Sequence, residues 1–393
     1  MFNFSGELET SKSWMNRALI IQSFDFDQIS LIGNSSSLDV ILLKKALADF
    51  KLGSCEFYAG LGGTTFRFLA LRISRSMGSF LIKADPALLS RPQQELIEIL
   101  TQLGVKAWLG SEGLFIESQG WQEPKSLLKI STNQSSQFLS AVLLNSIDLS
   151  FDLHIKIDHE IVSVDYYKYS RQILEKSEIN ILEIENSLFI KKNQKLKKQI
   201  LYGELDVSSA FSLITAAVIG GQVEIKNWNN QTIQPDIEFL KFFEKMNINL
   251  SINNNILKIA QQNNIQPLTA DLSTCPDLFP VLSVLCAFAA GESHLYGAPQ
   301  LKFKESDRIL KTAELLTKCG FICEPTNEGI KIQGRPHHAY SHKMNILFNP
   351  EHDHRMAMAA ALMKLKKFPV QIADVHVINK SYPQFYQHIG LNL

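Results

Sequence analysis

The chain has 393 residues, and its 39 Lys and Arg residues are balanced by 39 Asp and Glu residues, so its formal net charge is zero. This length predicts two or three domains rather than one ordinary core, and the neutral charge argues against a nucleic-acid binder that relies on an overall positive field. A hydrophobic content of 45% with 20% charged residues excludes disordered, collagen-like and disulfide-scaffold classes. Such a chain can bind anions only where a few cations converge.

Cysteine usage and hydropathy bear on the compartment. The five cysteines are scattered, with no C-x-x-C pair and no histidine spacing typical of zinc, which predicts a reducing cytoplasm and no metal site. The longest apolar run, 279–290, is too short to cross a bilayer, and the first seven residues lack the basic and apolar regions of a signal peptide. We expect a cytoplasmic monomer that binds neither membranes nor nucleic acids.

Two kinds of helix alternate along the chain. Apolar segments of helical length begin after short polar loops near residues 11, 63, 135, 208, 277 and 353. Between them lie helices that are followed by two short strands with alternating apolar residues. Four helix-and-strand pairs of this second kind are 96–104 with 114–117, 173–176 with 188–191, 239–246 with 256–259, and 315–320 with 330–332. Two of these helices end in Gly104 and Gly320, where a left-handed cap is favoured, and the Asn-rich tract 247–266 predicts hairpin turns.

The repeating unit is therefore a helix, a strand, a helix and paired strands, in six copies of roughly 65 residues. Three copies in each half predict an α/β protein with two domains of pseudo-threefold αβ units. This arrangement fits the pattern better than a Rossmann sheet or a TIM barrel, and a solenoid is the runner-up. Repeat counting places the break between the halves near residues 202–203.

Several of the predicted helix starts carry hydroxyl or cationic side chains, and a helix N-terminus attracts anions. They are Lys12, Ser13 and Arg17 at the first start, Gly63, Thr64 and Arg67 at the second, Ser135, Ser136 and Gln137 at the third, and Arg355 at the sixth. If the buried helices of each half run parallel, these starts gather on the face between the halves and form a cleft for two anionic substrates. The plain alternative is that the serines only cap their helices.

Three further segments have a simple structural interpretation beside a functional one. The loop 60–65 resembles a phosphate loop but lacks the Lys of a Walker A site and the G-x-G-x-x-G spacing. The cluster 302–308 packs three cations and two carboxylates before an apolar helix, which is also typical of a solvated helix start with local ion pairs. The segment 352–355 contains His-x-His without a third spaced ligand, so hydrogen bonding is favoured over a metal.

Six segments in order along the chain are Ser11–Leu19 (S-K-S-x-x-N-R-A-L), Arg91–Pro92 (R-P), Ser135–Leu139 (S-S-Q-F-L), Lys304–Arg308 (K-E-[ST]-D-R), Asp353–Ala357 (D-H-R-M-A) and Lys380–Pro383 (K-[ST]-[FY]-P). Together they resemble the motifs of the 5-enolpyruvylshikimate-3-phosphate synthases, also called 3-phosphoshikimate 1-carboxyvinyltransferases, a family of enolpyruvyl transferases in the shikimate pathway. The resemblance covers nearly the whole chain.

The resemblance implies a two-domain inverse αβ barrel, in which each domain has three pseudo-repeated αβ units with buried helices and outer sheets. The first domain would span 12–203 and the second 1–11 with 204–393, and the active site would lie in the cleft between them. The domains would close around shikimate-3-phosphate and phosphoenolpyruvate. No cofactor, metal or nucleotide is implied.

The resemblance also implies roles for single residues. The phosphoshikimate would be held by Lys12, Ser13, Arg17, Ser135, Ser136, Gln137, Ser163, Tyr166, Asp277 and Lys304. Phosphoenolpyruvate would be held by Lys12, Gly63, Arg91, Gln137, Arg308, Arg355 and Lys380. Asp277 would take the proton of the attacking hydroxyl, and Glu305 with Lys12 would protonate the enol methylene. Arginine forks suit the phosphate and carboxylate groups of both substrates.

Some positions depart from the family pattern. Glu9 and Thr10 replace a Pro-Gly pair, Leu61 replaces an asparagine, and Gln300 replaces the asparagine before the K-E-T-D-R block. The segment 163–168 differs from S-K-P-Y-x-D, and the chain is short between Arg17 and Arg91. A paralogue acting on a related hydroxylated ring acid, or a catalytically silent binding paralogue, therefore stays an alternative. The sibling transferase acting on UDP-N-acetylglucosamine uses a loop cysteine, which is absent beside Arg91.

Overall fold

The structure is a computed structural model that describes residues 1–158, 161–336 and 345–392. The chain forms two compact units, Thr10–Gly203 and a second made of Met1–Glu9 with Glu204–Leu393. We call them the 10–203 unit and the 204–393 unit. The chain first passes from the 204–393 unit into the 10–203 unit between Glu9 and Thr10, whereas the prediction placed this boundary between residues 11 and 12. Thr10 belongs to the 10–203 unit because its N–H donates to the Asn34 carbonyl at 2.8 Å and its Oγ1 accepts from the Asn34 N–H at 3.1 Å.

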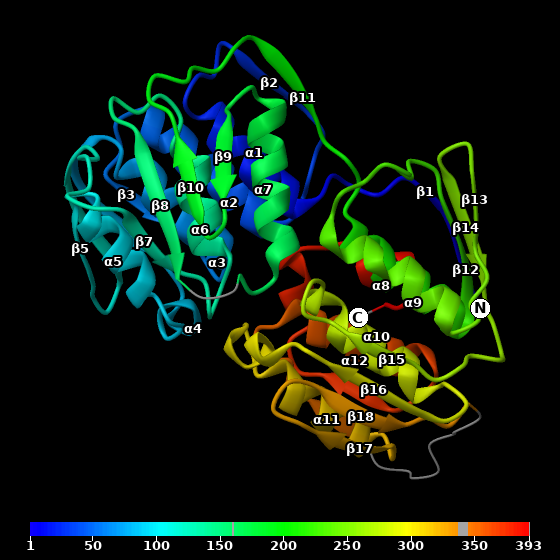
Figure 1. Cartoon of the computed structure of the whole chain (residues 1–393). Coiled ribbons are helices and arrows are strands. Elements are labelled where there is room, and N and C mark those ends of the chain that lie inside the picture. Colours follow the sequence, from blue (N-terminus) through cyan, green and yellow to red (C-terminus); the bar gives the residue numbers. More distant parts are fainter. Residues whose placement is uncertain (159–160, 337–344, 393) are drawn as a thin grey trace. The chain divides into compact units, whose positions relative to one another are not determined.

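In the described part of the 10–203 unit the strands form two four-stranded sheets, β3-β4-β6-β5 and β7-β8-β10-β9, and the two-stranded sheet β11-β2 (Figure 1). The strands are β2 (Ile29–Ile32), β3 (Glu56–Tyr58), β4 (Met77–Lys83), β5 (Lys106–Leu109), β6 (Gly113–Gln119), β7 (Leu128–Ser131), β8 (Leu153–Asp158), β9 (Ile181–Ile184), β10 (Ser187–Ile190) and β11 (Gln199–Tyr202). The helices are α1 (Lys12–Gln22), α2 (Leu38–Lys51), α3 (Gly63–Ile73), α4 (Pro86–Leu89), α5 (Gln94–Gln102), α6 (Gln137–Leu144) and α7 (Val164–Lys176).

The described part of the 204–393 unit has the corresponding sheets β1-β12-β14-β13, β15-β16-β18-β17 and β19-β20. The strands are β1 (Phe2–Gly6), β12 (Gly221–Ile225), β13 (Ser251–Asn253), β14 (Ile256–Ala260), β15 (Thr269–Asp271), β16 (Glu292–Tyr296), β17 (Ile322–Pro325), β18 (Ile330–Gln333), β19 (Ile346–Phe348) and β20 (Val370–Ile372). The α-helices are α8 (Val207–Gly220), α9 (Phe239–Lys245), α10 (Phe279–Ala287), α11 (Arg308–Lys318), α12 (His354–Leu365) and α13 (Phe385–His388), and the 3₁₀ helices are η1 (Pro235–Glu238), η2 (Pro276–Leu278), η3 (Pro299–Phe303) and η4 (His376–Lys380).

All the four-stranded sheets of the described chain share one topology. The first two strands run parallel, as in β3·β4 and β15·β16, and the second strand pairs antiparallel with the far arm of a hairpin, as in β4·β6 and β16·β18. The predicted repeat of a helix, a strand, a second helix and paired strands is thus found at each four-stranded sheet. The other two predicted copies have only the parallel pairs β2·β11 and β19·β20, because a single helix, α2, connects β2 to β3 and only the short helices η4 and α13 follow β20.

The predicted hairpin turns in the Asn-rich tract are confirmed. β13 and β14 pair antiparallel, and Asn254 and Asn255 between them have φ values of 50° and 60°. A two-residue turn in which both residues have positive φ follows the right-handed twist of the paired strands, and asparagine tolerates this conformation.

The core of each unit is built from buried helices, and two of them, α8 and α10, are almost entirely buried. The buried residues of α8 include nearly its whole length, and all the residues of α10 are buried. α8, α10 and α12 pack against one another, and so do α1, α3 and α6 in the 10–203 unit. A helix that is apolar all round is stable only when it is surrounded. The N-termini of these six helices carry many of the predicted site residues. Among the helices of the described ranges, none combines the length and apolar character that a membrane-spanning segment requires.

Candidate active-site clusters

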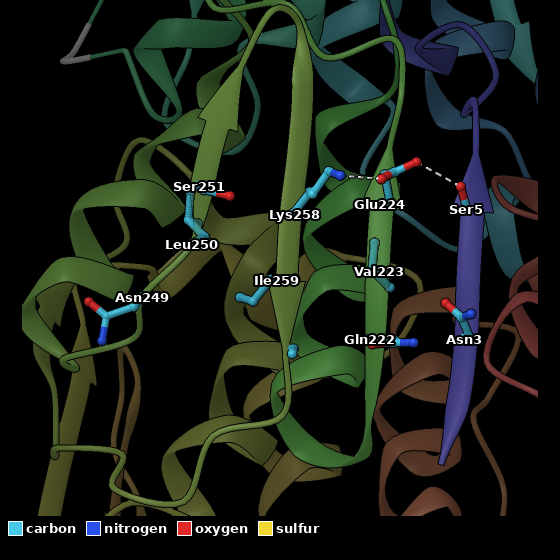
Figure 2. Close-up of a pocket in the computed structure, with 11 residues that line it drawn as sticks. Asn3, Ser5, Gln222, Val223, Glu224, Asn249, Leu250, Ser251, Lys258 and Ile259 are labelled. Carbon is cyan, nitrogen blue, oxygen red and sulfur yellow. Dashed lines mark hydrogen bonds and ion pairs between the residues drawn. The ribbon is translucent and has the colours of Figure 1, made fainter.

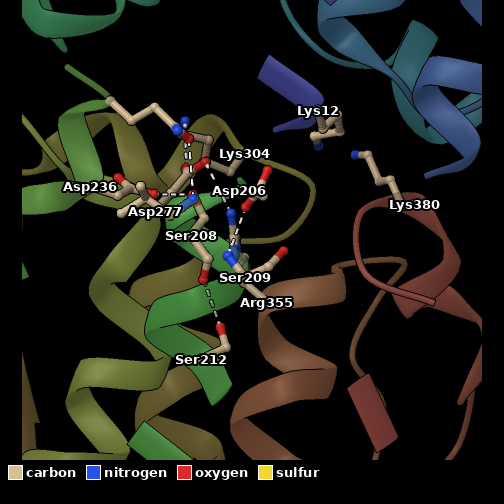
Figure 3. A network of polar contacts seen from close by, with 12 residues as sticks. Lys12, Asp206, Ser208, Ser209, Ser212, Asp236, Asp277, Lys304, Arg355 and Lys380 are labelled. Carbon is tan, nitrogen blue, oxygen red and sulfur yellow. Dashed lines mark hydrogen bonds and ion pairs between the residues drawn. The ribbon is translucent and has the colours of Figure 1, made fainter. Parts of the chain in front are cut away.

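The 204–393 unit holds a cluster of charged side chains at the starts of its buried helices (Figure 3). Arg308, the first residue of α11, lies at its centre with a side chain only 1% exposed. Its Nε and Nη2 donate to the two carboxylate oxygens of Asp353 at 2.8 and 3.3 Å, its Nη1 donates to Asp277 at 2.8 Å, and its Nη2 also donates to Glu305 at 3.2 Å. One guanidinium thus orients three carboxylates.

These carboxylate partners keep Arg308 protonated. Burial acts to lower the pKa of Arg308, but the carboxylates of Asp353, Asp277 and Glu305 raise it well above its ordinary value. Four of its five N–H groups are matched by the acceptors given above, which leaves one for any ligand. In this structure Arg308 therefore acts mainly on the neighbouring acids.

Asp277, at the start of η2, is surrounded by cations. Besides Arg308, the Lys304 Nζ donates to it at 3.3 Å, and Arg355 Nη2 lies 3.9 Å from its Oδ2. Burial acts to raise the pKa of Asp277, but these three cations lower it well below its ordinary value. The carboxylate is therefore ionised at neutral pH, and its side chain is 23% exposed, so a ligand can reach it.

Glu305 and Lys380 form the second part of this cluster. Lys380 Nζ donates to Glu305 Oε1, while the other oxygen of Glu305 accepts from Arg308. The two side chains are separated by 75 positions in the chain and are largely buried. The Glu305 carboxylate is therefore held in place by an ammonium group on one oxygen and a guanidinium group on the other.

Asp236, which no motif in the sequence indicated, belongs to the same cluster. This residue of η1 is 1% exposed and accepts a hydrogen bond from the Ser208 hydroxyl on α8 (Figure 3). Burial, together with the charge of Asp277, raises the pKa of Asp236 to about 6. Its signal in the sequence is the polar start Gln234-Pro235-Asp236 before an apolar helix, a pattern that resembles the starts that were identified.

The 10–203 unit holds a second group of predicted residues. Gly63, Arg91 and Gln137 come from the start of α3, the turn after α4 and the start of α6, and they meet at one point. A Cβ atom on Gly63 would lie 3.3 Å from Arg91 Nη1 and 3.4 Å from Gln137 Oε1. The Nε of Arg91 is buried without a hydrogen-bond partner among the described residues. This buried donor favours an anion as its partner.

Lys12 and Arg17 both lie on α1, but their side chains have different kinds of partner. Lys12 Nζ pairs with Asp39 of α2 at 3.2 Å, an acid that no motif in the sequence indicated. Arg17 donates to the Ser170 hydroxyl at 2.7 Å and to the carbonyls of Ser13 and Tyr166 at 2.8 and 3.1 Å. Burial lowers the pKa of Arg17 to about 10, so it remains charged at neutral pH.

The predicted serines are placed at helix starts, but not all of them cap. Ser136 occupies the N-cap of α6 without a capping hydrogen bond from its side chain, whereas the Ser135 hydroxyl accepts from the Gln137 N–H at 3.2 Å. Ser163 precedes α7 in a left-handed conformation with φ of 53°. The plain capping alternative therefore fits Ser135 better than Ser136.

A groove of about 670 Å³ lies elsewhere in the 204–393 unit, over the sheet β1-β12-β14-β13 (Figure 2). Glu224 in this groove accepts from the Ser5 hydroxyl at 2.8 Å and pairs with Lys258 at 2.6 Å. None of the predicted site residues lines the groove.

Comparison with known proteins gives one consistent result. A family model described as EPSP synthase (3-phosphoshikimate 1-carboxyvinyltransferase) matches residues 8–389. Relatives named 3-phosphoshikimate 1-carboxyvinyltransferase include those of Nostoc punctiforme, 26% identical over 97% of this chain and 94% of the relative, and of Syntrophobacter fumaroxidans, 29% identical over 96% and 94%. Among solved structures, EPSP synthase from Acinetobacter baumannii has a TM-score of 0.72 at 20% identity, covering 98% of this chain and 95% of that one. The enolpyruvyl transferase NikO from Streptomyces tendae has a TM-score of 0.73 at 11% identity, covering 99% of this chain and 94% of NikO. Both structures share the mixed α/β fold of this chain.

Proposed function

The chain belongs to the EPSP synthase (3-phosphoshikimate 1-carboxyvinyltransferase) family, and we propose that its two clusters act on one pair of substrates in that reaction. The enzyme transfers the enolpyruvyl (1-carboxyvinyl) group from phosphoenolpyruvate to the 5-hydroxyl of shikimate-3-phosphate and releases phosphate, a step of aromatic amino-acid (chorismate) biosynthesis. The observation that carries this proposal is the meeting of Gly63, Arg91 and Gln137, with an unpartnered buried donor on Arg91.

We also propose a fold for each unit, a position for the active site, an oligomeric state and a cellular compartment. Each unit would be an inverse αβ barrel of three αβ units, which is supported by its three mutually packed buried helices. The active site would lie in a cleft between the two domains and be completed when they close. A cytoplasmic monomer is proposed as well, and the free thiols of all five cysteines support a reducing compartment.

Phosphoenolpyruvate binding is assigned to both clusters. Lys12, Gly63, Arg91 and Gln137 would contribute from one unit, and Arg308, Arg355 and Lys380 from the other. The Nε of Arg355 is buried and has no hydrogen-bond partner within the described residues, as is true of Arg91. Arginine binds phosphate and carboxylate with two parallel hydrogen bonds, so these two side chains are the best prepared to receive the substrate anions.

The phosphoshikimate is assigned to Lys12, Ser13, Arg17, Ser135, Ser136, Gln137, Ser163, Tyr166, Asp277 and Lys304. Arg17 already donates to Ser13 and Tyr166 through their carbonyls. We therefore assign to Arg17 the placing of these two residues in addition to its charge. The unbonded side chain of Ser136 at an N-cap supports a ligand role for its hydroxyl.

The two acids suit an addition followed by an elimination. Asp277, held ionised by its cations, takes the proton of the 5-hydroxyl as the oxygen adds to C2 of phosphoenolpyruvate. Glu305, with Lys12 and beside Lys380, supplies a proton to C3, which gives a tetrahedral ketal. The methyl carbon then returns a proton as the C–O bond to phosphate breaks, and phosphate leaves with the proton held by Asp277. Arg308 keeps both acids in place throughout.

The decisive experiment measures phosphate release by the purified protein from phosphoenolpyruvate, with and without shikimate-3-phosphate. We expect release only when both are present. A panel of other hydroxylated ring acids serves as the comparison. A higher kcat/KM with one of these would identify a paralogue with another acceptor, and tight binding of both ligands without release would identify a silent paralogue.

A further inference from the structure

We propose that Arg67 is a positioning residue, which fixes the side-chain amide of Gln137 so that its Nε2 rather than its Oε1 faces the substrate anion. This inference rests on the proposed function, because Gln137 is assigned there to both substrates. Arg67 itself was noted in the sequence only as a cation near a helix start.

Arg67 lies on α3 one turn after Gly63, and it is 3% exposed. Its Nη1 donates to Gln137 Oε1 at 2.8 Å. The face of its guanidinium lies over the ring of Phe138, with 4.4 Å between Cζ and the ring centre. The hydrogen bond and the aromatic contact both involve the first turn of α6, so the position of Arg67 is coupled to that of Gln137.

The bond matters because a glutamine amide can present either of two faces. Its oxygen is an acceptor and its nitrogen a donor, and the two orientations have nearly the same shape. With Oε1 bound to Arg67, the amide nitrogen is left for another partner, and it makes no hydrogen bond among the described residues. The oxygen lies 3.4 Å from the Cβ position of Gly63, and there the Arg67 guanidinium binds it at 2.8 Å. Its negative charge density is therefore compensated by Arg67, and the amide nitrogen stays available as the donor for an anion.

The same guanidinium also holds the turn that carries Arg91. Its Nη2 donates to the Pro92 carbonyl at 3.2 Å and its Nε to Gln93 Oε1 at 3.1 Å. Gln93 in turn donates through Nε2 to the Leu88 carbonyl at 3.2 Å, at the end of α4. One buried side chain therefore sets the place of Arg91 and of Gln137, the two side chains nearest to the Cβ position of Gly63.

The test compares Arg67→Met with Arg72→Met. Arg72 is a second arginine of α3, which donates to Ser23 at 2.7 and 2.8 Å and lies over the rings of Phe24 and Phe50, away from the assigned site. We expect Arg67→Met to raise the KM for phosphoenolpyruvate by at least about 10-fold, the loss typical of one hydrogen bond to a charged group. Arg72→Met should lower the melting temperature but leave that KM within about 2-fold of wild type. An unchanged KM in Arg67→Met would overturn the proposal.

Variants of Gln137 separate orientation from simple packing. Gln137→Glu keeps an acceptor for Arg67 but turns an oxygen toward the anion, so it should raise the KM for phosphoenolpyruvate more than Gln137→Met does. In a Gln137→Met background, Arg67→Met should raise the KM less than it does in the wild-type enzyme, because its bond to Gln137 is already absent and only its bonds to Pro92 and Gln93 remain to be lost. A Gln137→Glu enzyme that binds as well as wild type, or full additivity of the two Met variants, contradicts the proposal.

These outcomes remain distinct from failure of the proposed function. If the wild-type protein releases no phosphate, the same variants are compared by calorimetric titration with phosphoenolpyruvate in the presence of shikimate-3-phosphate. The order of dissociation constants is then expected to follow the order given for KM. If Arg67→Met fails to fold, the comparison of Gln137→Glu with Gln137→Met decides.

Discussion

Two neighbouring carboxyl groups of the 204–393 unit have pKa values that are shifted in opposite directions. Asp277 has Lys304, Arg308 and Arg355 around it, and the pKa of Asp277 is low although burial opposes this. Asp236 is more deeply buried and has a hydroxyl as its hydrogen-bond donor, and burial raises the pKa of Asp236 to about 6. When two acids lie in one site, the better-compensated one keeps its charge and the other is driven toward its neutral form.

The acid and base assignments predict a separation of binding from turnover. Asp277→Asn and Glu305→Gln keep the size of each side chain and one of its two acceptor oxygens but remove its proton chemistry. We expect each to lower kcat by roughly 100- to 10,000-fold, the usual contribution of general acid–base catalysis, while both ligands still bind in calorimetric titration. Loss of the folded state in circular dichroism would instead assign these residues a structural role.

The raised pKa of Asp236 predicts a variant that is more stable than wild type. The folded protein holds this proton more tightly than the unfolded chain, so stability falls as the pH rises from about 4 to about 6 and stays reduced above that. The difference between 3.8 and about 6 corresponds to at most about 3 kcal/mol. Asp236→Asn removes the buried charge, and we expect it to raise the unfolding free energy by roughly 1 to 3 kcal/mol at pH 7.5.

The pH dependence provides the check. In urea titrations the advantage of Asp236→Asn should shrink as the pH is lowered from 7.5 toward 4. Asp165→Asn is the control, because Asp165 is a more exposed acid that pairs with Lys168 at 3.0 Å, and it should give no gain at any pH. An advantage that is independent of pH would show that the carboxylate charge is not its cause.

At the scale of elements, the second helix of each four-stranded sheet ends in the same way. α5, α7, α9 and α11 are followed by a residue with positive φ, namely Gly104 at 77°, Glu178 at 62°, Asn247 at 57° and Gly320 at 83°. The N–H of the next residue then bonds back to the helix, from Val105 to Leu100, Ile179 to Leu174, Ile248 to Phe243 and Phe321 to Leu316, at 2.8 to 3.0 Å. Only the two glycine caps were predicted from the sequence, because glutamate rarely adopts this conformation.

These caps predict opposite effects of two exchanges. A side chain other than glycine costs roughly 1 to 2 kcal/mol in the left-handed region, while glycine costs about 0.5 to 1 kcal/mol in chain entropy. Glu178→Gly should therefore raise the unfolding free energy by up to about 1 kcal/mol, and Gly320→Ala should lower it by about 1 kcal/mol. Both positions are exposed, so differences in packing are small. Equal signs for the two changes in urea unfolding would refute this account.

At the scale of the whole molecule, a neutral chain keeps its site cations partly neutralised by its own acids. Lys12 is paired with Asp39 in one unit, and Lys380 with Glu305 in the other. In the 204–393 unit three carboxylates lie among the cations, so that cluster is close to electrical balance. The cluster of the 10–203 unit keeps a net positive charge, because Arg17 and Arg67 bind neutral groups and Arg91 has a buried unpartnered donor. Two dianionic or trianionic substrates need more positive charge than either cluster alone provides, which is the physical reason to assign one substrate pair to both units.

This assignment predicts that substitutions in either unit weaken the binding of the same ligand. Lys12→Met and Lys380→Met should each weaken phosphoenolpyruvate binding, measured by calorimetry with shikimate-3-phosphate present, by roughly 10- to 100-fold, because each removes one charge-assisted hydrogen bond. Lys106→Met is the control, since Lys106 is an exposed lysine of the 10–203 unit that pairs with Glu117 at 2.9 Å. If only one of the two site variants affects binding, the substrate belongs to one unit alone.

The sequence by itself determined the features that depend on neighbouring residues. The buried apolar helices, the hairpin at Asn254 and Asn255, the glycine caps and the motifs that identify the family are all local patterns, and local conformational preference is enough to produce them. Only the tertiary structure decided the rest. Asp236, Asp39 and the role of Arg67 escaped detection because their partners lie 28, 27 and 70 positions away. Their burial and charge compensation, and with them the pKa of Asp236 and the orientation of Gln137, exist only once the helix starts are packed together, since hydrogen bonds and Coulomb forces act across space and not along the chain.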